Sequence, residues 1–416
     1  MQLGYTMVSG PFRAFAHRNF RLYWMGMCVS LIGTWMQTVG QSWLVLELTD
    51  SAFLLGLQTA LQYVPALILT LPAGCVADRL PKRWLLIVTQ SSMMVLAFVQ
   101  AALTLSGRIA YWHLAVLSFF VGISTAFDMP VRHSFMIEMV GREDLTSAIS
   151  LNSAMFNVAR IVGPAAAGLV MGAFGAGIAF LVNGLSFLAI IASLLLIDVE
   201  EQTSLGNLRE QLATLWTDVA QGLSFIRGTP RVLLTLASLT LMCLFVFNYQ
   251  VLVPVFARQV LGQDATGYGL LMTATGIGAL AGAIASSFIN SGGPQSRMVR
   301  VGSFAASAIS LAVAAVRSYY SAAVLLAAYG WWMVVFTSTV NAVLQMSSPD
   351  HLRGRVMSVY SLILLGSVPF GGLYVGSISN VLGARWGFAL GGIAGIASAW
   401  LVLAWQRRLP SEKGIG

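Results

Sequence analysis

The chain has 416 residues, of which 57% are hydrophobic and only 9% are charged, with a formal net charge of +8. Soluble domains carry about 25% charged residues, and even a large soluble protein needs a charged, hydrated surface. The composition therefore excludes a soluble enzyme, a disordered chain and a secreted disulfide scaffold, and it indicates a protein whose main solvent is lipid.

Twelve apolar stretches are long enough to cross a bilayer, which takes roughly 17–25 residues for a helix. They are continuous rather than alternating, so they predict helices and exclude a membrane β-barrel. The predicted fold class is an all-α membrane protein with twelve transmembrane helices. The stretches are centred near Ser30, Leu61, Val95, Phe120, Ile161, Leu188, Phe245, Gly276, Ser307, Val334, Val368 and Ala394.

The basic residues predict the orientation of these spans. With a cytoplasmic N-terminus, most of the 23 Lys and Arg residues fall on the cytoplasmic side, which is the positive-inside pattern. Only Arg108, Arg258, Arg317 and Arg385 fall on the other side, and Arg160 lies within a span. Both termini are therefore expected in the cytoplasm, and the basic charge needs no nucleic-acid partner.

The longest polar interruption divides the chain into two halves of six spans each. Within it, apolar residues recur at spacings of three and four, which predicts an amphipathic helix at the membrane surface rather than a disordered linker. Similar segments open the second and eighth spans, near Asp50 and Asp264, and such internal symmetry is typical of transporters. The expected organisation is a cytoplasmic segment 1–21, a six-helix bundle 22–197, a cytoplasmic connector 198–230, a second bundle 231–406 and a cytoplasmic tail 407–416.

The loop between the second and third spans, residues 74–83, has the sequence GCVADRLPKR. It resembles the Gly-x-x-x-Asp-Arg-x-x-Arg-Arg signature of the major facilitator superfamily, with Pro81 and Lys82 as mild departures. We expect a close helix approach at one end of the loop, and a carboxylate that meets a helix N-terminus near Gly354. The alternative for the basic residues is that they only anchor the topology. The expected gating residues here are Gly74, Asp78, Arg79, Lys82, Arg83 and Arg132, the last paired with Asp78 or Asp128.

The fifth span contains residues 160–168, RIVGPAAAG. They resemble the Gly-Pro-x-x-Gly-Gly signature of the antiporter branch of the superfamily, which implies an exporter. Pro164 removes a backbone donor and bends the helix. Gly163, Pro164 and Gly168 are therefore expected conformational residues that pack on the eighth span, at Gly276, Gly278 and Gly282. The alternative is a plain packing face of small residues.

A longer run of motifs covers residues 18–22, 33–37, 127–132, 141–145 and 150–153. In this order they are similar to the bacterial facilitator group called transmembrane secretion effectors, which includes enterobactin exporters and is similar to macrolide efflux pumps. The resemblance implies two pseudo-symmetric six-helix bundles of the major facilitator fold in a bacterial inner (plasma) membrane. It also implies export by alternating access, without fixing the substrate.

The resemblance places the central cavity along the first, fourth, seventh and tenth spans. Several of these spans carry polar residues on one face, and polar groups in lipid must face water or one another. Hydrogen bonding between helices is the equal alternative for each residue. The expected cavity residues suit a bulky amphipathic or aromatic compound, and they are Trp35, Gln37, Gln41, Asn248, Gln250, Asn341 and Gln345.

Three charged residues are candidates for proton coupling. Arg160 lies deepest in a span and needs an anionic or carbonyl partner, for which Asp128 is the candidate. That pair could be structural, or Asp128 could carry a proton. Glu47, near the outer end of the first span, is the other acid that could take up a proton, with an exposed interfacial charge as its alternative.

No stretch has the pattern of an ATP-binding loop, a metal site or a catalytic constellation. We therefore expect a monomer without cofactor, metal or enzymatic activity, whose partners are the bilayer and a small molecule. The sequence favours a proton-driven exporter of a drug-like or siderophore-like molecule. The alternatives are a nutrient importer or facilitator of the same fold and, more remotely, a multi-pass membrane protein that transports nothing.

Overall fold

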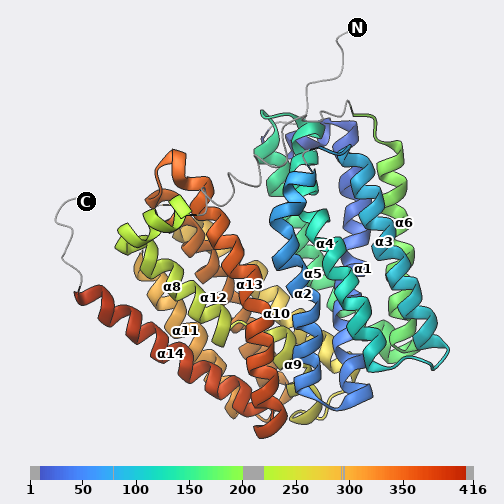
Figure 1. The fold of residues 1–416 in the computed structure, drawn as a ribbon. Coiled ribbons are helices and arrows are strands. Elements are labelled where there is room, and N and C mark those ends of the chain that lie inside the picture. The colour runs from blue at the N-terminus through green and yellow to red at the C-terminus, as the bar shows by residue number, and fades with distance from the viewer. Residues whose placement is uncertain (1–9, 78, 200–219, 292, 294–295, 409–416) are drawn as a thin grey trace. The chain divides into compact units, whose positions relative to one another are not determined.

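The computed structural model describes residues 10–77, 79–199, 220–291, 293 and 296–408 (Figure 1). Throughout these ranges the regular structure is helical, as the continuous apolar runs predict. A short 3-10 helix, Gly10–Ala16, precedes the first long helix. The helices of the first half are α1 (Arg18–Thr49), α2 (Ala52–Ala77), α3 (Lys82–Leu105), α4 (Tyr111–Val140), α5 (Leu145–Phe174) and α6 (Ala176–Leu196). Those of the second half are α8 (Pro230–Phe245), α9 (Tyr249–Gln259), α10 (Ala265–Ile289), α11 (Ser296–Ala315), α12 (Tyr319–Ser347), α13 (Asp350–Leu382) and α14 (Ala384–Arg408).

The predicted fold class is confirmed. In the described part of the chain, 11 helical stretches are long and apolar enough to cross a membrane, with α8 and α9 counted as one. The other long helix is α1, which has 32 residues and carries polar residues such as Gln37 and Gln41 that lower its hydropathy. The chain is a multi-pass membrane protein with an all-helical fold.

The chain forms two compact units, which we call unit 1 and unit 2. The described residues of unit 1 fall within Met1–Asp50, Leu61–Leu212 and Asp264–Thr273. Those of unit 2 fall within Ser51–Ala60, Ala213–Gln263 and Ala274–Gly416. The first turns of α2 thus belong to unit 2, and the first turns of α10 belong to unit 1.

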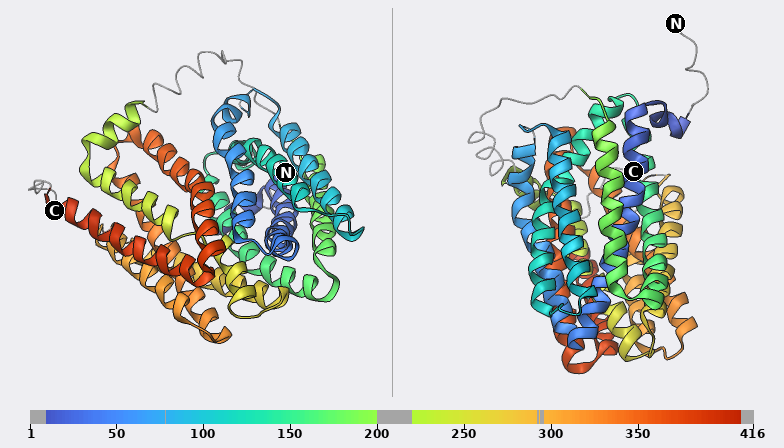
Figure 2. Two further views of the ribbon diagram at one scale, coloured as in Figure 1. Left: turned by 60° about the horizontal axis from the view of Figure 1, so that its bottom comes forward. Right: turned by 90° about the vertical axis from the view of Figure 1, so that its right-hand side faces the viewer.

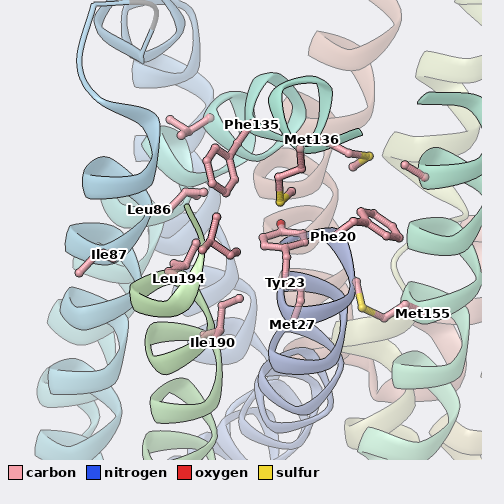
Figure 3. Close-up of a cluster of buried hydrophobic side chains, with 14 of the residues drawn as sticks. Phe20, Tyr23, Met27, Leu86, Ile87, Phe135, Met136, Met155, Ile190 and Leu194 are labelled. Atoms are coloured by element: carbon pink, nitrogen blue, oxygen red, sulfur yellow. The ribbon is translucent and has the colours of Figure 1, made fainter. Parts of the chain in front are cut away.

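The core of unit 1 lies where α1, α3, α4 and α6 meet (Figure 3). Phe20 and Phe135 are 1% and 0% exposed, so this packing excludes water completely. Small residues let α1 approach α6, since a Cβ atom added at Gly26 would lie 2.3 Å from the hydroxyl oxygen of Ser193. Such close approach is typical of membrane helices, in which packing rather than hydrophobic burial drives association.

In unit 2 the membrane span formed by α8 and α9 is interrupted at residues 246–248. Backbone carbonyls freed by such a break need partners inside a membrane. The hydroxyl of the fully buried Tyr329 donates a hydrogen bond to the carbonyl of Val246, and the side-chain amide of Asn248 donates to the carbonyl of Leu244 at 2.9 Å. The break is therefore stabilised by side chains of the unit itself.

The internal repeat is visible at two glycines that separate consecutive helices. Gly175, between α5 and α6, has φ = 79°, and Gly383, between α13 and α14, has φ = 92°. Both values lie where residues with a Cβ atom are strained, so glycine is the residue suited to each sharp turn. The two halves thus use the same device at corresponding places.

Most of the predicted amphipathic connector, 198–230, lies outside the described residues. Its end, 220–228, is helical. Ile226 is 4% exposed and belongs to the core of unit 2, whereas Leu223 is 40% exposed.

Candidate functional site

A cavity of about 460 Å³ opens among α1, α3, α4, α5 and α6 of unit 1. Its wall combines soft apolar groups with polar ones, which is the usual make-up of a small-molecule site. Thioethers are polarisable and flexible, so they adapt to ligands of different shape. The apolar wall includes Tyr23, Met27, Met93, Met129, Met136, Met155, Phe156 and Phe187, and the polar wall Thr34, Thr125, Asp128, Arg132, His133, Asn152, Ser153 and Asn157.

A buried ion pair on α4 forms the charged part of this wall. Arg132 lies one helical turn after Asp128, and its Nε donates to Oδ2 of that carboxylate. The side chain of Asp128 is 5% exposed and that of Arg132 is 23% exposed, so the guanidinium is the more accessible partner. The sequence left Asp78 and Asp128 open as partners of Arg132, and the structure shows the pair with Asp128.

Two neighbours on α3 hold the other oxygen of the Asp128 carboxylate. Thr89 donates its hydroxyl to Oδ1 at 3.0 Å, and Gln90 donates its side-chain amide to the same atom at 2.6 Å. A buried carboxylate is costly unless its lone pairs are satisfied. With three donors, the ionised form of Asp128 has the partners that it needs.

Arg160 has a carbonyl partner, which is one of the two kinds that the sequence predicts, and this partner belongs to an asparagine. Its guanidinium donates to Oδ1 of Asn157 at 2.8 Å, one turn earlier on α5, while Asp128 is engaged by Arg132 on its own helix. The reason is geometric, because residues four apart on one helix already face each other. Arg160 therefore adjoins the cavity through Asn157, which lines it.

The polar face of α1 bonds to neighbouring helices of unit 1. Gln37 donates to Oε1 of Gln100 on α3 at 3.0 Å and accepts a hydrogen bond from Asn183 on α6. Gln41 donates to the hydroxyl of Ser118 on α4 at 2.6 Å. Both glutamines are more than nine-tenths buried. Their side chains form hydrogen bonds between helices, which was the alternative to lining a cavity, and neither lines the unit 1 cavity.

Two other residues of α1 take part in aromatic contacts. Trp35 is 9% exposed and meets Phe156 of the cavity wall edge to face, with ring centroids 5.8 Å apart. Glu47 is exposed and accepts a hydrogen bond from the indole of Trp43 at 2.7 Å. The structure thus places Trp35 directly behind the cavity wall and Glu47 near the far end of α1.

The cavity residues expected in the second half all lie in unit 2. Asn248 is buried in the break between α8 and α9, and its Oδ1 packs on Gly371 of α13. Gln250 is half-buried at the start of α9. On α12, Gln345 is exposed and donates to Oδ1 of Asn341 at 2.6 Å, one turn away.

At the loop between α2 and α3, the structure differs from the expected close helix approach at Gly74. Gly74 lies in α2, and among the described residues no neighbouring helix has an atom within 4 Å of where its Cβ would be, so no close helix contact is made there. Asp78 lies outside the described residues. Arg79 is half-buried in the turn that follows α2.

The basic residues of this loop bind groups on neighbouring helices. Lys82 pairs with Glu138 near the end of α4 at 2.5 Å. Arg83 donates to the carbonyls of Leu194 and Leu195 at 2.6 and 2.7 Å. Cations at a helix C-terminus satisfy free carbonyls and oppose the helix dipole, so Arg83 caps α6.

We expect the Lys82–Glu138 pair to stabilise unit 1, because the two side chains are only 14% and 11% exposed. Glu138→Gln alone leaves a largely buried ammonium without its counter-ion and should cost about 1–3 kcal/mol. Adding Lys82→Gln should recover part of this loss. Thermal unfolding in detergent measures the cycle, and additive single effects would contradict the coupling. Arg353→Gln is the control, since its partner Asp350 is 91% exposed and no measurable change is expected.

The glycine-proline segment of α5 packs on two helices. A Cβ atom added at Gly163 would lie 2.4 Å from Cβ of Trp35 on α1. At Gly168 it would lie 3.1 Å from Cα of Gly269 on α10, whose Thr266 donates to the carbonyl of Gly168 at 3.1 Å. Pro164 is buried in the interior of α5. The predicted contact with the eighth span is present, but its glycine is Gly269, because Gly278 and Gly282 pack on Ala327 and Trp331 of α12.

Sequence reasoning missed Thr89, Gln90 and Glu138. Thr89 and Gln90 lie in an apolar stretch with no motif around them, and only their polarity within a membrane span could have singled them out. Glu138 is an acid near the end of a span, so its charge beside an apolar stretch was the signal that could have singled it out. Among the described residues, no group of three or more His, Cys, Asp or Glu side chains could hold a metal ion.

Comparisons with known proteins identify the family of this chain. A family model described as transmembrane secretion effector matches residues 9–414. The staphyloferrin A transporter of Staphylococcus aureus is 25% identical over 91% of this chain and 94% of its own length. The multidrug efflux pump Tap of Mycolicibacterium fortuitum is 27% identical over 84% and 87%.

A solved structure of a bacterial homologue of the human lysosomal transporter Spinster has the same fold. It matches with a TM-score of 0.76 at 13% identity, over 97% of this chain and 98% of that one. The family match, the two full-length relatives and this fold agree with one another. The chain is therefore a small-molecule transporter of the major facilitator type and belongs to the transmembrane secretion effector family.

Proposed function

We propose that the protein exports a bulky amphipathic molecule, drug-like or siderophore-like, across the bacterial inner membrane in exchange for protons. Both termini would lie in the cytoplasm, and a monomer would work by alternating access without ATP. The observation that carries this proposal is the unit 1 cavity, in which a buried ion pair adjoins five methionines and several aromatic rings. The names of the two relatives, a staphyloferrin A transporter and a multidrug efflux pump, support transport of such molecules, and the second name supports export.

The Asp128–Arg132 pair offers a way to couple protons to this cavity. When Asp128 is ionised, it fixes Arg132 through a charge-assisted hydrogen bond. When Asp128 takes up a proton, Arg132 loses its ionic partner, and its guanidinium becomes free to reorient in the cavity wall. The wall therefore has two states that differ by one proton, and antiport requires that the substrate binds the ionised one.

The small-residue contacts of α5 and the loop before α3 support the conformational part of the proposal. Residues 74–83 would act as a gate with Arg132, and Gly163, Pro164 and Gly168 would let α5 move against its neighbours. Glu47 and Arg160 are further candidates for the proton path. Gly163, Pro164, Gly168, Glu47 and Arg160 do not line the cavity, so their roles are separable from substrate binding, whereas Arg132 lines it.

Everted membrane vesicles test the direction and the coupling. Respiration acidifies their interior, and a pH-sensitive dye follows the gradient while macrolides, cationic dyes and ferric siderophores are added in turn. Wild-type vesicles should show a drop in the gradient on adding a substrate, and vesicles lacking the protein should not. Substrate uptake by right-side-out vesicles without this drop would identify an importer and refute the proposal.

A further inference from the structure

A second cavity lies in unit 2, on the surface formed by α11 and α14. These two helices pack on each other and run side by side in Figure 1 and in the left view of Figure 2. The cavity has a volume of about 530 Å³ and is open on one side. Two arginines and five apolar residues line it, and no residue of the unit 1 site takes part. We call it the α11–α14 groove.

One end of the groove is strongly basic. Arg297 and Arg300 lie in the first turns of α11, which begins at Ser296 and has no acidic residue there. A helix N-terminus is itself the positive end of the dipole, so two cations there repel each other and the helix unless an anion balances them. Among the residues that the structure describes, neither arginine forms an ion pair with a carboxylate.

The guanidinium of Arg300 is held in place at this end. It donates to Oε1 of Gln406 on α14 at 3.0 Å, so the basic group is fixed between the two helices. Arg297 is exposed one turn earlier. A phosphate accepts hydrogen bonds from guanidinium groups in a planar, bidentate geometry that arginine favours over lysine.

The rest of the groove is apolar and follows α11 away from the arginines. Val301, Ala305 and Ala308 continue the face that starts at Arg297, and the small alanines form the floor. Ala308 follows Arg297 by 11 positions, and these 11 steps rise about 16 Å at 1.5 Å per residue. One leaflet of the hydrocarbon core is about 15 Å deep, half of the roughly 30 Å total.

Aromatic side chains also border the apolar part of the groove. Phe304 of the wall meets Trp400 of α14 edge to face, with centroids 5.7 Å apart. Trp400 and Trp405 are 56% and 44% exposed on an apolar helix. Exposed tryptophans on membrane helices often anchor them at the interface with water. The groove therefore faces lipid along its length.

From this geometry we propose that the α11–α14 groove binds one anionic phospholipid. Its phosphate is held by Arg297 and Arg300, and one acyl chain lies over Ala305 and Ala308. A soluble phosphate fits the arginines but leaves the apolar floor without a partner, whereas a phospholipid matches both parts. Basic pockets between membrane helices at the interface are known to select anionic headgroups.

Native mass spectrometry of the purified full-length protein tests the proposal. The protein is exchanged into detergent with defined phosphatidylglycerol or phosphatidylcholine, and the bound lipids are counted. Phosphatidylglycerol should be retained in preference, and Arg297→Gln with Arg300→Gln should remove one bound molecule per chain. Each arginine should contribute about fivefold in affinity, as basic residues do near an anionic surface. Arg317→Gln, an exposed arginine just beyond the other end of α11, is the matched control and should change nothing.

A second variant tests the apolar part without altering charge. Ala308→Leu fills the floor at an exposed position, so it should weaken phosphatidylglycerol binding while the protein keeps its elution profile and melting temperature. Equal retention by the double arginine variant and the wild type would overturn the proposal. Displacement of the lipid by millimolar inorganic phosphate, with no effect of Ala308→Leu, would instead show a site for a free anion and overturn it as well. None of these measurements depends on transport.

Discussion

Asp128→Asn is expected to reduce proton-driven efflux to the level of membranes that lack the protein. Asparagine keeps the shape of the side chain and can still accept from Thr89 and Gln90, which now hold Oδ1 at 3.0 and 2.6 Å. It cannot exchange a proton near neutral pH, and it no longer forms an ion pair with Arg132. The cavity wall is then locked in one charge state, and the cycle that links it to the proton gradient is broken.

Everted vesicles measure this effect as the initial rate of substrate-induced gradient loss. Glu143→Gln is the matched control, because it removes another acid of unit 1 that is exposed and lies outside the cavity wall. Asp128→Glu keeps a titratable carboxyl and should restore part of the rate. Wild-type efflux by Asp128→Asn, in a protein that melts at the usual temperature, would rule out the coupling role.

Gly163→Ala is expected to have the largest effect on stability among the motif residues. The added methyl would lie 2.4 Å from Cβ of Trp35 and 3.0 Å from the carbonyl oxygen of Ile32. Neither neighbour can turn away, since a Cβ atom is fixed by its own backbone and a carbonyl oxygen is part of the backbone, so α5 must move off α1. Overpacking of this kind costs about 1–3 kcal/mol, and it also displaces Trp35 behind the cavity wall.

Gly74→Ala makes the same chemical change where there is space. Nothing lies within 4 Å of the added methyl, and alanine should favour the helix by about 0.5–1 kcal/mol over glycine. Thermal unfolding of the two variants in detergent should therefore move in opposite directions. A similar loss in both would show that the superfamily signature, rather than local packing, decides the role of Gly74.

Much of the fold could be predicted from the sequence because lipid imposes a simple rule. Every span needs about twenty apolar residues and must satisfy its own backbone, so composition and length reveal the helices. Local rules extend this success to particular residues. Asp128 is one of the two partners that the sequence left open for Arg132, and a spacing of four residues brings their side chains to the same face of α4.

The contacts between helices could not be predicted in the same way. Gln37 and a cavity-lining glutamine look identical in sequence, and only the positions of Gln100 and Asn183 show that Gln37 bonds to α3 and α6. Likewise, α10 contains several glycines, and the register of its packing decides that Gly269 rather than Gly278 meets α5. Sequence periodicity defines a helix face but not the neighbour opposite it.

The interruption between α8 and α9 bears on how unit 2 can change shape. A continuous helix must break backbone hydrogen bonds to bend sharply, at a high cost in lipid. Here the carbonyls of Leu244 and Val246 already have side-chain donors in Asn248 and Tyr329. A bend at residues 246–248 would therefore leave the ladder within each segment intact, and Tyr329→Phe would leave the carbonyl of Val246 without its side-chain donor.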